Sequence, residues 1–430
     1  MLSSPNPHYM KLLIKQAVIA DQFSPFNGQT QDILISDGFV ISISPSISDS
    51  ADKTIEAQGL HISPGWVDIF CQFHDPGGEH KETLESGAQA AAAGGFTDVF
   101  VVPNTAPVLH SKSQIEYVIQ KSPALAASVH PIGAITKNCE GKELAEMYDM
   151  RNSGALTFSD GWNALQSSQV MLKALQYVKA FGGIIIQLPE EVSLSKNGLM
   201  NEGIVSTQLG LPGKPAIAES LMISRDIELL RYTNSRLHIT GISTRSGIDL
   251  VRKAKAEGLD ITCSVTPYHL TFTDADLFNY DTNLKVNPCI RTPADVDALK
   301  AAVIDGTVDC ISSHHYPQDW DNKVCEFEYA KNGMEGLESS AGAVLKALPE
   351  LTSTQLVNLF SLNARKIFGL QSNKIEADSE ANFTLFVPHQ ETVFTKKQIK
   401  SLCSNNAFIG KTIAAKVIGT IKGKRLHLND

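Results

Sequence analysis

The chain has 430 residues, a formal net charge of −9, 43% hydrophobic residues and 19% charged residues. These values are ordinary for a soluble globular protein and leave room for one barrel-sized core or two to three smaller domains. The acidic balance argues against a nucleic-acid partner, because no basic stretch offsets it locally and the Lys-Gly-Lys-Arg run at 422–425 is short.

The seven cysteines form no CxxC pair, which predicts reduced thiols and not a disulfide framework. Residues 1–8 lack the basic segment and apolar run of a signal peptide. No apolar stretch approaches the length that spans a bilayer. We therefore expect a cytoplasmic protein without a membrane partner.

Both ends of the chain indicate β-structure. Short apolar or alternating runs lie at 11–20, 31–36 and 39–44, and Asp37-Gly38 between the last two is a strong hairpin signal. Similar runs return near the other end, at 382–387 and 414–421. We expect residues 1–60 and 371–430 to form one small β-sandwich side domain built from both termini.

The region 61–370 alternates short apolar strands with helix-length segments. Strands are expected at 61–70, 96–102, 128–134, 155–159, 183–188, 236–241, 259–264 and 308–313, with helices at 84–93, 164–180, 218–232, 247–256, 293–303 and 353–370. Alternation predicts a parallel sheet, and eight repeats suit a closed (β/α)8 TIM barrel. An open doubly wound sheet fits less well, because no GxGxxG follows an early strand.

The motifs of residues 63–108 carry a resemblance to a known family. They read Ser63-Pro-Gly-Trp-Val-Asp-Ile-Phe-Cys-Gln-Phe-His-Asp-Pro-Gly-Gly-Glu-His-Lys-Glu82 and then Ala90-Ala-Ala-Ala-Gly-Gly-Phe-Thr-Asp-Val-Phe-Val-Val-Pro-Asn-Thr-Ala-Pro-Val108. The sequence resembles a dihydroorotase of the amidohydrolase superfamily, of the type found with aspartate carbamoyltransferase. Further matches extend it over essentially the whole chain: Thr266-Pro-Tyr-His-Leu270, Lys285-Val-Asn-Pro-Cys-Ile-Arg291, Gly336-Leu-Glu338, Asn363-Ala-Arg365 and Ala381-Asn-Phe-Thr-Leu-Phe386.

The resemblance implies a reaction and a metal for the active members. They close carbamoyl aspartate reversibly to dihydroorotate, using zinc at the C-terminal mouth of the barrel. Bound zinc makes water a nucleophile near neutral pH and polarises the carbonyl, while a carboxylate moves the proton. This chemistry needs His and carboxylate ligands from several strand ends.

Most positions where the resemblance implies ligands hold other residues here. The family ends its first strand in His-x-His-x-Arg, where this chain has Phe70, Gln72 and, at the cationic position, His74. Phenylalanine cannot ligate zinc, glutamine seldom does, and histidine lacks the two-pronged guanidinium. On strand five, Leu188 stands where an imidazole is implied.

The ends of the later strands also hold residues that differ from the ligands and the general base that the resemblance implies. The implied ligand of strand six is replaced by Gly241, and Ser313 replaces the carboxylate that acts as general base. A hydroxyl at its ordinary pKa cannot take that role unaided. The remaining carboxylate is Asp160 on strand four. We therefore expect no catalytic residue and no bound metal from the family's set.

Four polar residues remain as candidate contacts for a small molecule: Asn104, Asn287, His74 and His314. The alternative for both asparagines is that they brace the strand-end loops. A rebuilt zinc site from His314, His74 and Asp160 is a second alternative. His238 and His269 are expected to be core hydrogen-bond donors, and Cys71 a buried packing thiol.

These observations lead to three hypotheses. The first is a catalytically silent dihydroorotase homologue, homo-oligomeric, kept as a structural or regulatory partner of aspartate carbamoyltransferase or of an active dihydroorotase. The second is a diverged amidohydrolase that opens a cyclic amide through the rebuilt zinc site. The third is a small-molecule sensor that uses Asn104 and Asn287 without turnover.

Overall fold

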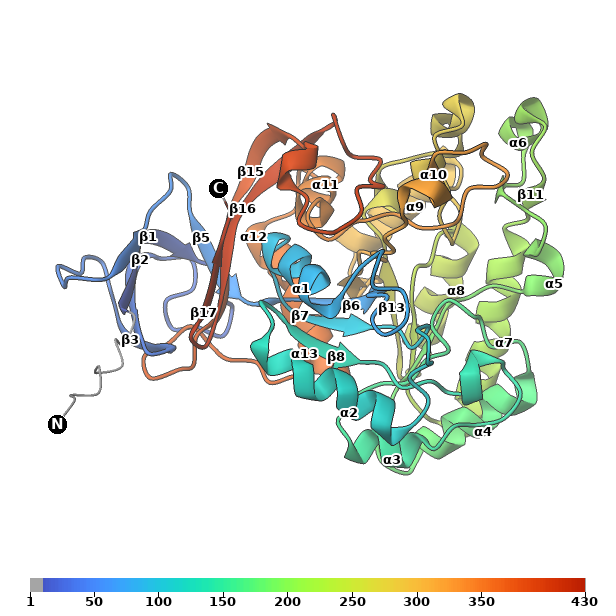
Figure 1. Ribbon diagram of the computed structural model, residues 1–430, viewed down its shortest axis with the longest axis horizontal. Coiled ribbons are helices and arrows are strands. Elements are labelled where there is room, and N and C mark those ends of the chain that lie inside the picture. Colours follow the sequence, from blue (N-terminus) through green and yellow to red (C-terminus); the bar gives the residue numbers. More distant parts are fainter. Residues whose placement is uncertain (1–10, 430) are drawn as a thin grey trace.

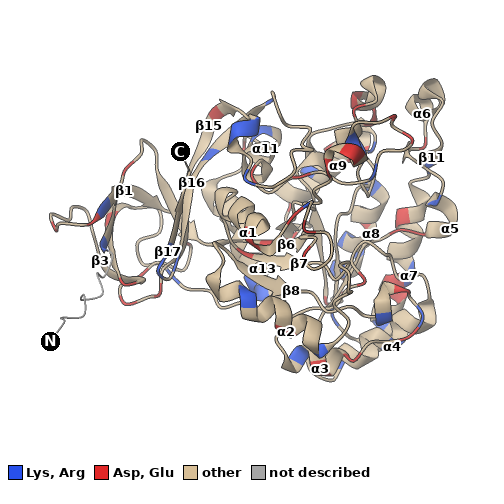
Figure 2. Cartoon of the chain, viewed as in Figure 1, with Lys and Arg blue, Asp and Glu red and all other residues tan. Residues whose placement is uncertain are grey.

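The computed structural model describes residues 11–429 (Figure 1). The segment 1–8, for which the sequence predicts no signal peptide, lies outside the described residues. Across the described part of the chain, no helix is both long and apolar enough to cross a membrane. Acidic and basic residues are interspersed over the helices and strands in the view of Figure 2.

Strands from both ends of the chain form one mixed sheet (Figure 1). Its strands pair in the order β17-β16-β15-β5-β1-β2-β3, with β4 paired to β1. Their apolar faces enclose a separate core that includes Ile14, Ile62 and Phe383. These strands form one continuous eight-stranded sheet, where the sequence predicted a β-sandwich. The strands are β1 Lys11–Ile19, β2 Thr30–Ser36, β3 Phe39–Ser44, β4 Lys53–Ile55, β5 His61–Pro64, β15 Asn382–Val393, β16 Thr412–Lys422 and β17 Arg425–Leu428.

The middle of the chain forms parallel ladders in chain order. One sheet runs β6-β7-β8 and another β9-β12-β13-β14. The strand expected at 155–159 is reduced to Phe158, which bridges Gly133 on one side and Ile185 on the other. Eight parallel segments therefore follow one another as the alternating pattern predicted. The strands are β6 Trp66–Cys71, β7 Phe96–Val101, β8 Ser128–Pro131, β9 Ile185–Gln187, β12 Leu237–Ile239, β13 Ile261–Val265 and β14 Cys310–Ile311.

Helices connect these strands and pack their apolar faces on the common core. The expected helices are present within a few residues, and 353–370 is divided by a π-helical turn, Asn358–Leu362. The helices are α1 Leu84–Ala93, α2 Lys112–Lys121, α3 Met147–Asn152, α4 Ser168–Lys179, α7 Ile217–Thr233, α8 Arg245–Ala256, α9 Pro293–Ile304, α11 Ser340–Ala347, α12 Ser353–Val357 and α13 Asn363–Phe368. Short elements in the loops are α5 Val192–Ser195, β10 Met200–Asn201, α6 Ile204–Leu209, β11 Gly213–Lys214 and α10 Trp320–Lys323.

The single strand expected at 61–70 is two strands in different sheets. β5 pairs with β1 and β15, whereas β6 pairs with β7. The break falls at Gly65, where an added Cβ would lie 2.1 Å from the Thr97 hydroxyl oxygen. The Gly65 carbonyl accepts a hydrogen bond from the Arg365 guanidinium at 2.7 Å. Close packing at this residue lets the chain pass from one sheet to the other.

A buried ion-pair network joins the two sheet systems. Asp98 on β7 lies 2.9 Å from the Arg365 guanidinium and 2.8 Å from His130 Nε2, and Lys422 at the end of β16 also pairs with it. Burial opposes ionisation of Asp98, but the charges of Arg365 and Lys422 hold its pKa well below the ordinary value. The network therefore fixes the terminal sheet to the parallel strands.

Candidate functional site at the strand ends

Aromatic rings cover the carboxyl ends of the parallel strands. Phe70, fully buried at the end of β6, has its ring centroid 4.8 Å from that of His314 and 5.0 Å from that of Trp162. Trp162 in turn stacks on Tyr316, with centroids 4.6 Å apart and planes inclined by 15°. The rings thus pack on one another where the resemblance implies a metal centre. An open hollow of ≈ 400 Å³ lies over Trp162, Tyr316 and Asn287.

Gly241 and His314 are fitted to each other. Gly241 has a φ of +68°, and a Cβ added there would lie 2.4 Å from His314 Cε1. Side chains other than glycine are strained at this φ and would also collide with the imidazole. His314 is buried, and its Nε2 lies 2.8 Å from the Thr240 hydroxyl. Burial, with the neighbouring imidazoles of His269 and His238, holds the pKa of His314 well below its ordinary value, so the ring is neutral.

The amide of Gln72 is fully engaged in hydrogen bonds. Its Nε2 donates to the Asn104 carbonyl oxygen at 2.9 Å, and its Oε1 accepts from Trp162 Nε1 at 2.9 Å. Both ends of the Asn104 amide are also hydrogen-bonded. Its Nδ2 donates to the Asp160 backbone carbonyl oxygen at 3.1 Å, and its Oδ1 accepts from the Trp162 backbone N–H at 3.0 Å. Both amides therefore brace the loops around Trp162.

The carboxylate of Asp160 faces Thr136. It accepts hydrogen bonds from the Thr136 N–H at 2.8 Å and from the Thr136 hydroxyl at 2.5 Å. Burial raises the pKa of Asp160 to about 6, and the hydrogen bonds from Thr136 oppose that rise. A carboxylate held by this loop is not directed at an ion.

Asn287 belongs to a polar triad at the edge of the hollow. Its Nδ2 donates to Glu190 Oε2 at 2.8 Å, and its Oδ1 accepts from Lys214 Nζ at 2.9 Å. Lys214 also pairs with Glu190 at 2.8 Å. Burial raises the pKa of Glu190, but the charge of Lys214 together with hydrogen bonds from Lys214, Asn287 and Ser195 outweighs burial and lowers that pKa overall. The ammonium of Lys214 is therefore already paired.

His74 and Ser313 are also bound to nearby groups. His74 Nε2 lies 3.0 Å from the Pro317 carbonyl oxygen, and burial lowers the pKa of His74 to about 4. It is therefore neutral near pH 7 and supplies no cation. The Ser313 N–H donates to Asp68 Oδ2 at 2.6 Å, and its hydroxyl accepts from the His315 N–H at 3.0 Å.

The core histidines and Cys71 lie as expected from the sequence. His238 contacts the hydroxyls of Thr262 and Ser264 at 2.9 and 3.1 Å, and burial lowers its pKa to about 3. His269 also has a pKa lowered to about 3 by burial. Cys71 is buried, and burial with the charge of Asp68 raises its thiol pKa well above the ordinary value. Such a thiol is a packing group and not a nucleophile.

The structure does not bring His314, His74 and Asp160 together as a metal site. Each is turned to its own partner: Thr240, Pro317 and Thr136. Within residues 11–429, the one group of three ionisable side chains placed to hold an ion lies elsewhere, at His315, Glu335 and Glu338.

Comparisons with known proteins identify the family. Residues 59–247 match the family model described as "Dihydro-orotase-like". The chain is 38% identical over 423 residues to a dihydroorotase of Geobacter sp. (strain M21), covering 97% of this chain and 99% of that protein. It is 39% identical over 418 residues to a dihydroorotase of Ruminiclostridium cellulolyticum, covering 96% and 97%. The chain belongs to the dihydroorotase family.

Solved structures support the same fold. The L-hydantoinase (dihydropyrimidinase) of Arthrobacter aurescens superimposes with a TM-score of 0.81 at 22% identity, covering 98% of each chain. A D-hydantoinase superimposes with a TM-score of 0.82 at 19% identity. At this identity the likeness concerns the fold alone. It agrees with a dihydroorotase-type arrangement of parallel strands and a β-sheet domain.

The zinc centre that the dihydroorotase family implies does not fit the residues of this mouth. A catalytic zinc needs about three protein ligands with nitrogen, sulfur or carboxylate donors. Phe70, Leu188 and Gly241 offer no donor atom, and the His314 ring lies against both Phe70 and Gly241. No catalytic step through a metal at this mouth therefore follows from these side chains.

Two residues of the alternative group were not selected from the sequence. His315 was visible beside His314, and neighbours on a strand end point to opposite sides. In the structure His314 contacts Thr240, while His315 lies near Glu82 and Glu335. The available signal was the adjacent pair of histidines at 314 and 315, combined with two glutamates three residues apart at Glu335 and Glu338.

Proposed function

We propose that this protein is a dihydroorotase homologue that does not catalyse the family reaction and that serves as a structural or regulatory partner. The packing of His314 against Phe70 and over Gly241 carries the proposal, because it takes up the space where ligands would converge. The neutral His74 and the serine at position 313 support it further, since neither supplies the missing cation or general base.

The proposed scaffold is a closed (β/α)8 barrel over 61–370 with a composite β domain from 1–60 and 371–430. A hydrogen bond from the Gln72 N–H to the His315 carbonyl oxygen, at 2.7 Å, supports closure by linking the segments that follow β6 and β14. A cytoplasmic location is part of the proposal. The alternative, an amidohydrolase with a rebuilt zinc centre, has less support because His314, His74 and Asp160 face separate partners.

Growth complementation tests the loss of activity in a cell. In a bacterial strain without its own dihydroorotase, the chain is expected not to restore growth without an added pyrimidine. The Geobacter sp. dihydroorotase, expressed to the same level, is the positive control. Growth on this chain at the control's rate would contradict the proposal.

Assembly with aspartate carbamoyltransferase tests the partner role. The proposed partner is the aspartate carbamoyltransferase of the same organism, because the sequence resembles the dihydroorotase type found with that enzyme. Mixed and separated by size-exclusion chromatography with light scattering, the two proteins are expected to elute as one complex, and the chain alone as a homo-oligomer. Separate elution at micromolar concentrations would count against this partner.

A further inference from the structure

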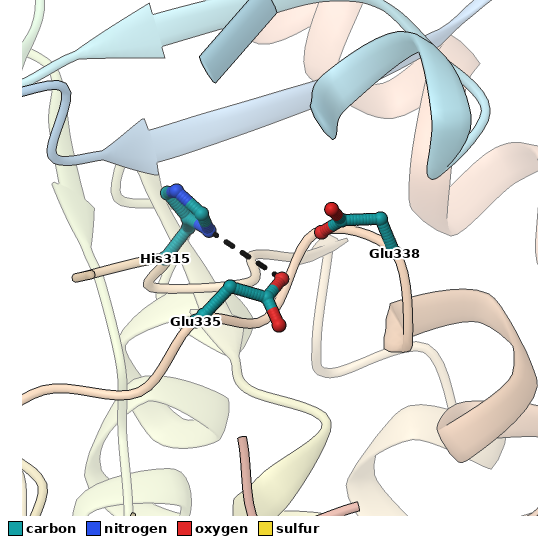
Figure 3. A group of neighbouring side chains, drawn as sticks. All are labelled: His315, Glu335 and Glu338. Atoms are coloured by element: carbon teal, nitrogen blue, oxygen red, sulfur yellow. Dashed lines mark ion pairs between the residues drawn. The ribbon is translucent and has the colours of Figure 1, made fainter. Parts of the chain in front are cut away.

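A second group of ionisable side chains lies in the loops after β14 and before α11. His315 follows β14, and Glu335 and Glu338 precede α11 (Figure 3). We call these three residues the His–Glu cluster. His315 and Glu335 are fully buried, and Glu338 is 9% exposed. Figure 3 shows the three side chains turned toward one another, with an ion pair drawn between His315 and Glu335.

Each carboxylate of the cluster has one anchored oxygen and one without a hydrogen bond. Glu335 Oε2 accepts from Asn406 Nδ2 at 2.7 Å, and Glu338 Oε1 accepts from the Lys400 N–H at 2.8 Å. The other oxygens, Glu335 Oε1 and Glu338 Oε2, are buried and find no hydrogen-bond donor in the described chain. Buried polar atoms nearly always have a partner, so such exceptions point to an ion or solvent at the site. Outer hydrogen bonds of this kind also orient metal-binding carboxylates.

The imidazole of His315 lies between carboxylates. Its Nδ1 is 3.8 Å from Glu335 Oε1, and its Nε2 is 3.5 Å from Glu82 Oε2. A long hydrogen bond of 3.3 Å from the Gly336 N–H reaches Nδ1, while Nε2 has no hydrogen-bond partner among residues 11–429. Nδ1 is thus close enough to Glu335 to share a cation with it, while Nε2, on the other edge of the ring, faces Glu82 at a distance too long for a strong hydrogen bond.

The charges of this region are not balanced within the protein. Glu82, Glu335 and Glu338 are three buried carboxylates, and in the part of the chain that is described none of them pairs with a lysine or arginine. Uncompensated buried charge costs several kcal/mol, so protons or a cation must neutralise the group.

We propose that the His–Glu cluster binds one divalent transition-metal ion, best matched by zinc, at a structural site separate from the strand-end mouth. One imidazole with carboxylates is a donor set that zinc accepts, at bond lengths of about 2.0–2.2 Å. The three ligand atoms lie within 4.8 Å of one another, so small side-chain rotations bring them to one ion. Glu82 lies at the opposite ring nitrogen, where a carboxylate can accept the N–H of a metal-bound imidazole.

Such an ion would connect the loop after β14 to the segment before α11, and Glu82 would hold the ring from a third segment. His315 belongs to the loop after β14, the two cluster glutamates precede α11, and Glu82 precedes α1 and is bonded to the hydroxyls of Ser86 and Ser401. The inference goes beyond the proposed function, because a structural ion here needs no catalytic mouth and adds none.

Metal content and thermal stability of the full-length protein test the site. After chelator treatment and dialysis, the protein is titrated with zinc chloride, and bound zinc is measured by inductively coupled plasma mass spectrometry. The wild type is expected to retain about one zinc per chain and to melt at a higher temperature when zinc is present. Glu335→Gln, which keeps the side-chain shape, is expected to lose both effects, and His315→Ala likewise.

Two matched variants distinguish this site from zinc bound elsewhere on the chain. His80→Ala removes an exposed imidazole and is expected to leave zinc binding unchanged. His314→Ala is also expected to retain zinc, whereas loss there would locate the ion in the mouth and overturn the inference. A wild type without bound zinc, or Glu335→Gln that folds by circular dichroism and retains zinc like wild type, would overturn it as well. None of these measurements depends on catalysis, so their outcome does not decide whether the proposed function is correct.

Discussion

Individual side chains at the strand-end mouth compensate one another. The glycine at 241 provides the space that the His314 ring occupies, and that ring packs on Phe70. Gln72 and Asn104 then hold Trp162 over them. The mouth is therefore packed and hydrogen-bonded. A substitution that restored one implied ligand would contact the neighbouring side chains that stand in place of the others.

A double-mutant cycle measures the fit of Gly241 and His314. Gly241→Ala is expected to destabilise the fold by about 2–4 kcal/mol, from left-handed backbone strain plus the collision with His314. In the background of His314→Ala the same change is expected to cost only about 1–2 kcal/mol, the strain alone. Urea unfolding followed by circular dichroism gives these values.

Gly210→Ala is the matched control, because Gly210 has the same φ of +68° with nothing within 4 Å of an added Cβ. It is expected to cost about 1–2 kcal/mol in both backgrounds. Equal costs for Gly241→Ala with and without His314 would show that the ring does not fill this space.

Side-chain chemistry at single positions could be predicted from the sequence, but contacts between distant residues could not. Phe70, Leu188 and Gly241 lack donor atoms wherever they point, so their inability to bind zinc required no coordinates. The proximity of His315 and Glu335 depends on the path of the chain between β14 and α11. A periodic sequence pattern does not predict that path. Asp160 remained ambiguous because its partner, Thr136, is brought by another strand-end loop.

Among the elements, the parallel strands were predicted well and the junctions between the sheets were not. The alternation of short apolar runs with helix-length segments, and their composition, predict β6, β7 and the later strands. The division of 61–70 at Gly65 arises from tertiary contacts with Thr97 and Arg365, which a local pattern does not contain. Asp98 joins the same contacts, so one buried carboxylate holds β7, α13 and β16 together.

Replacing Asp98 by asparagine tests this junction. Asp98→Asn leaves the Arg365 and Lys422 charges buried without their carboxylate, and is expected to destabilise the protein by about 3–5 kcal/mol. Asp249→Asn is the control, because Asp249 pairs with Arg252 on the exposed face of α8 and is expected to cost less than about 1 kcal/mol. Thermal and urea unfolding check both, and equal small losses would show that the junction contributes little.

At the scale of the whole molecule, the chain keeps the fold of the family, but its residues do not fit the metal centre that the family implies. The chain matches dihydroorotases over nearly its entire length, and buried hydrophobic residues pack around the parallel strands and within the terminal sheet. Phe70, Gly241 and Ser313 stand at this mouth where the resemblance implies other residues, while His315, Glu335 and Glu338 lie in the loops after β14 and before α11. This pattern is the one that the proposed loss of the family reaction predicts.

The rate of the family reaction with purified, zinc-loaded protein tests the central claim most directly. Conversion is followed in both directions between carbamoyl aspartate and dihydroorotate, with the Geobacter sp. dihydroorotase assayed beside it at equal concentration. We predict no turnover above the buffer background, because no ligand set or general base converges at the mouth. Turnover at a rate comparable to that of the control enzyme would contradict the account.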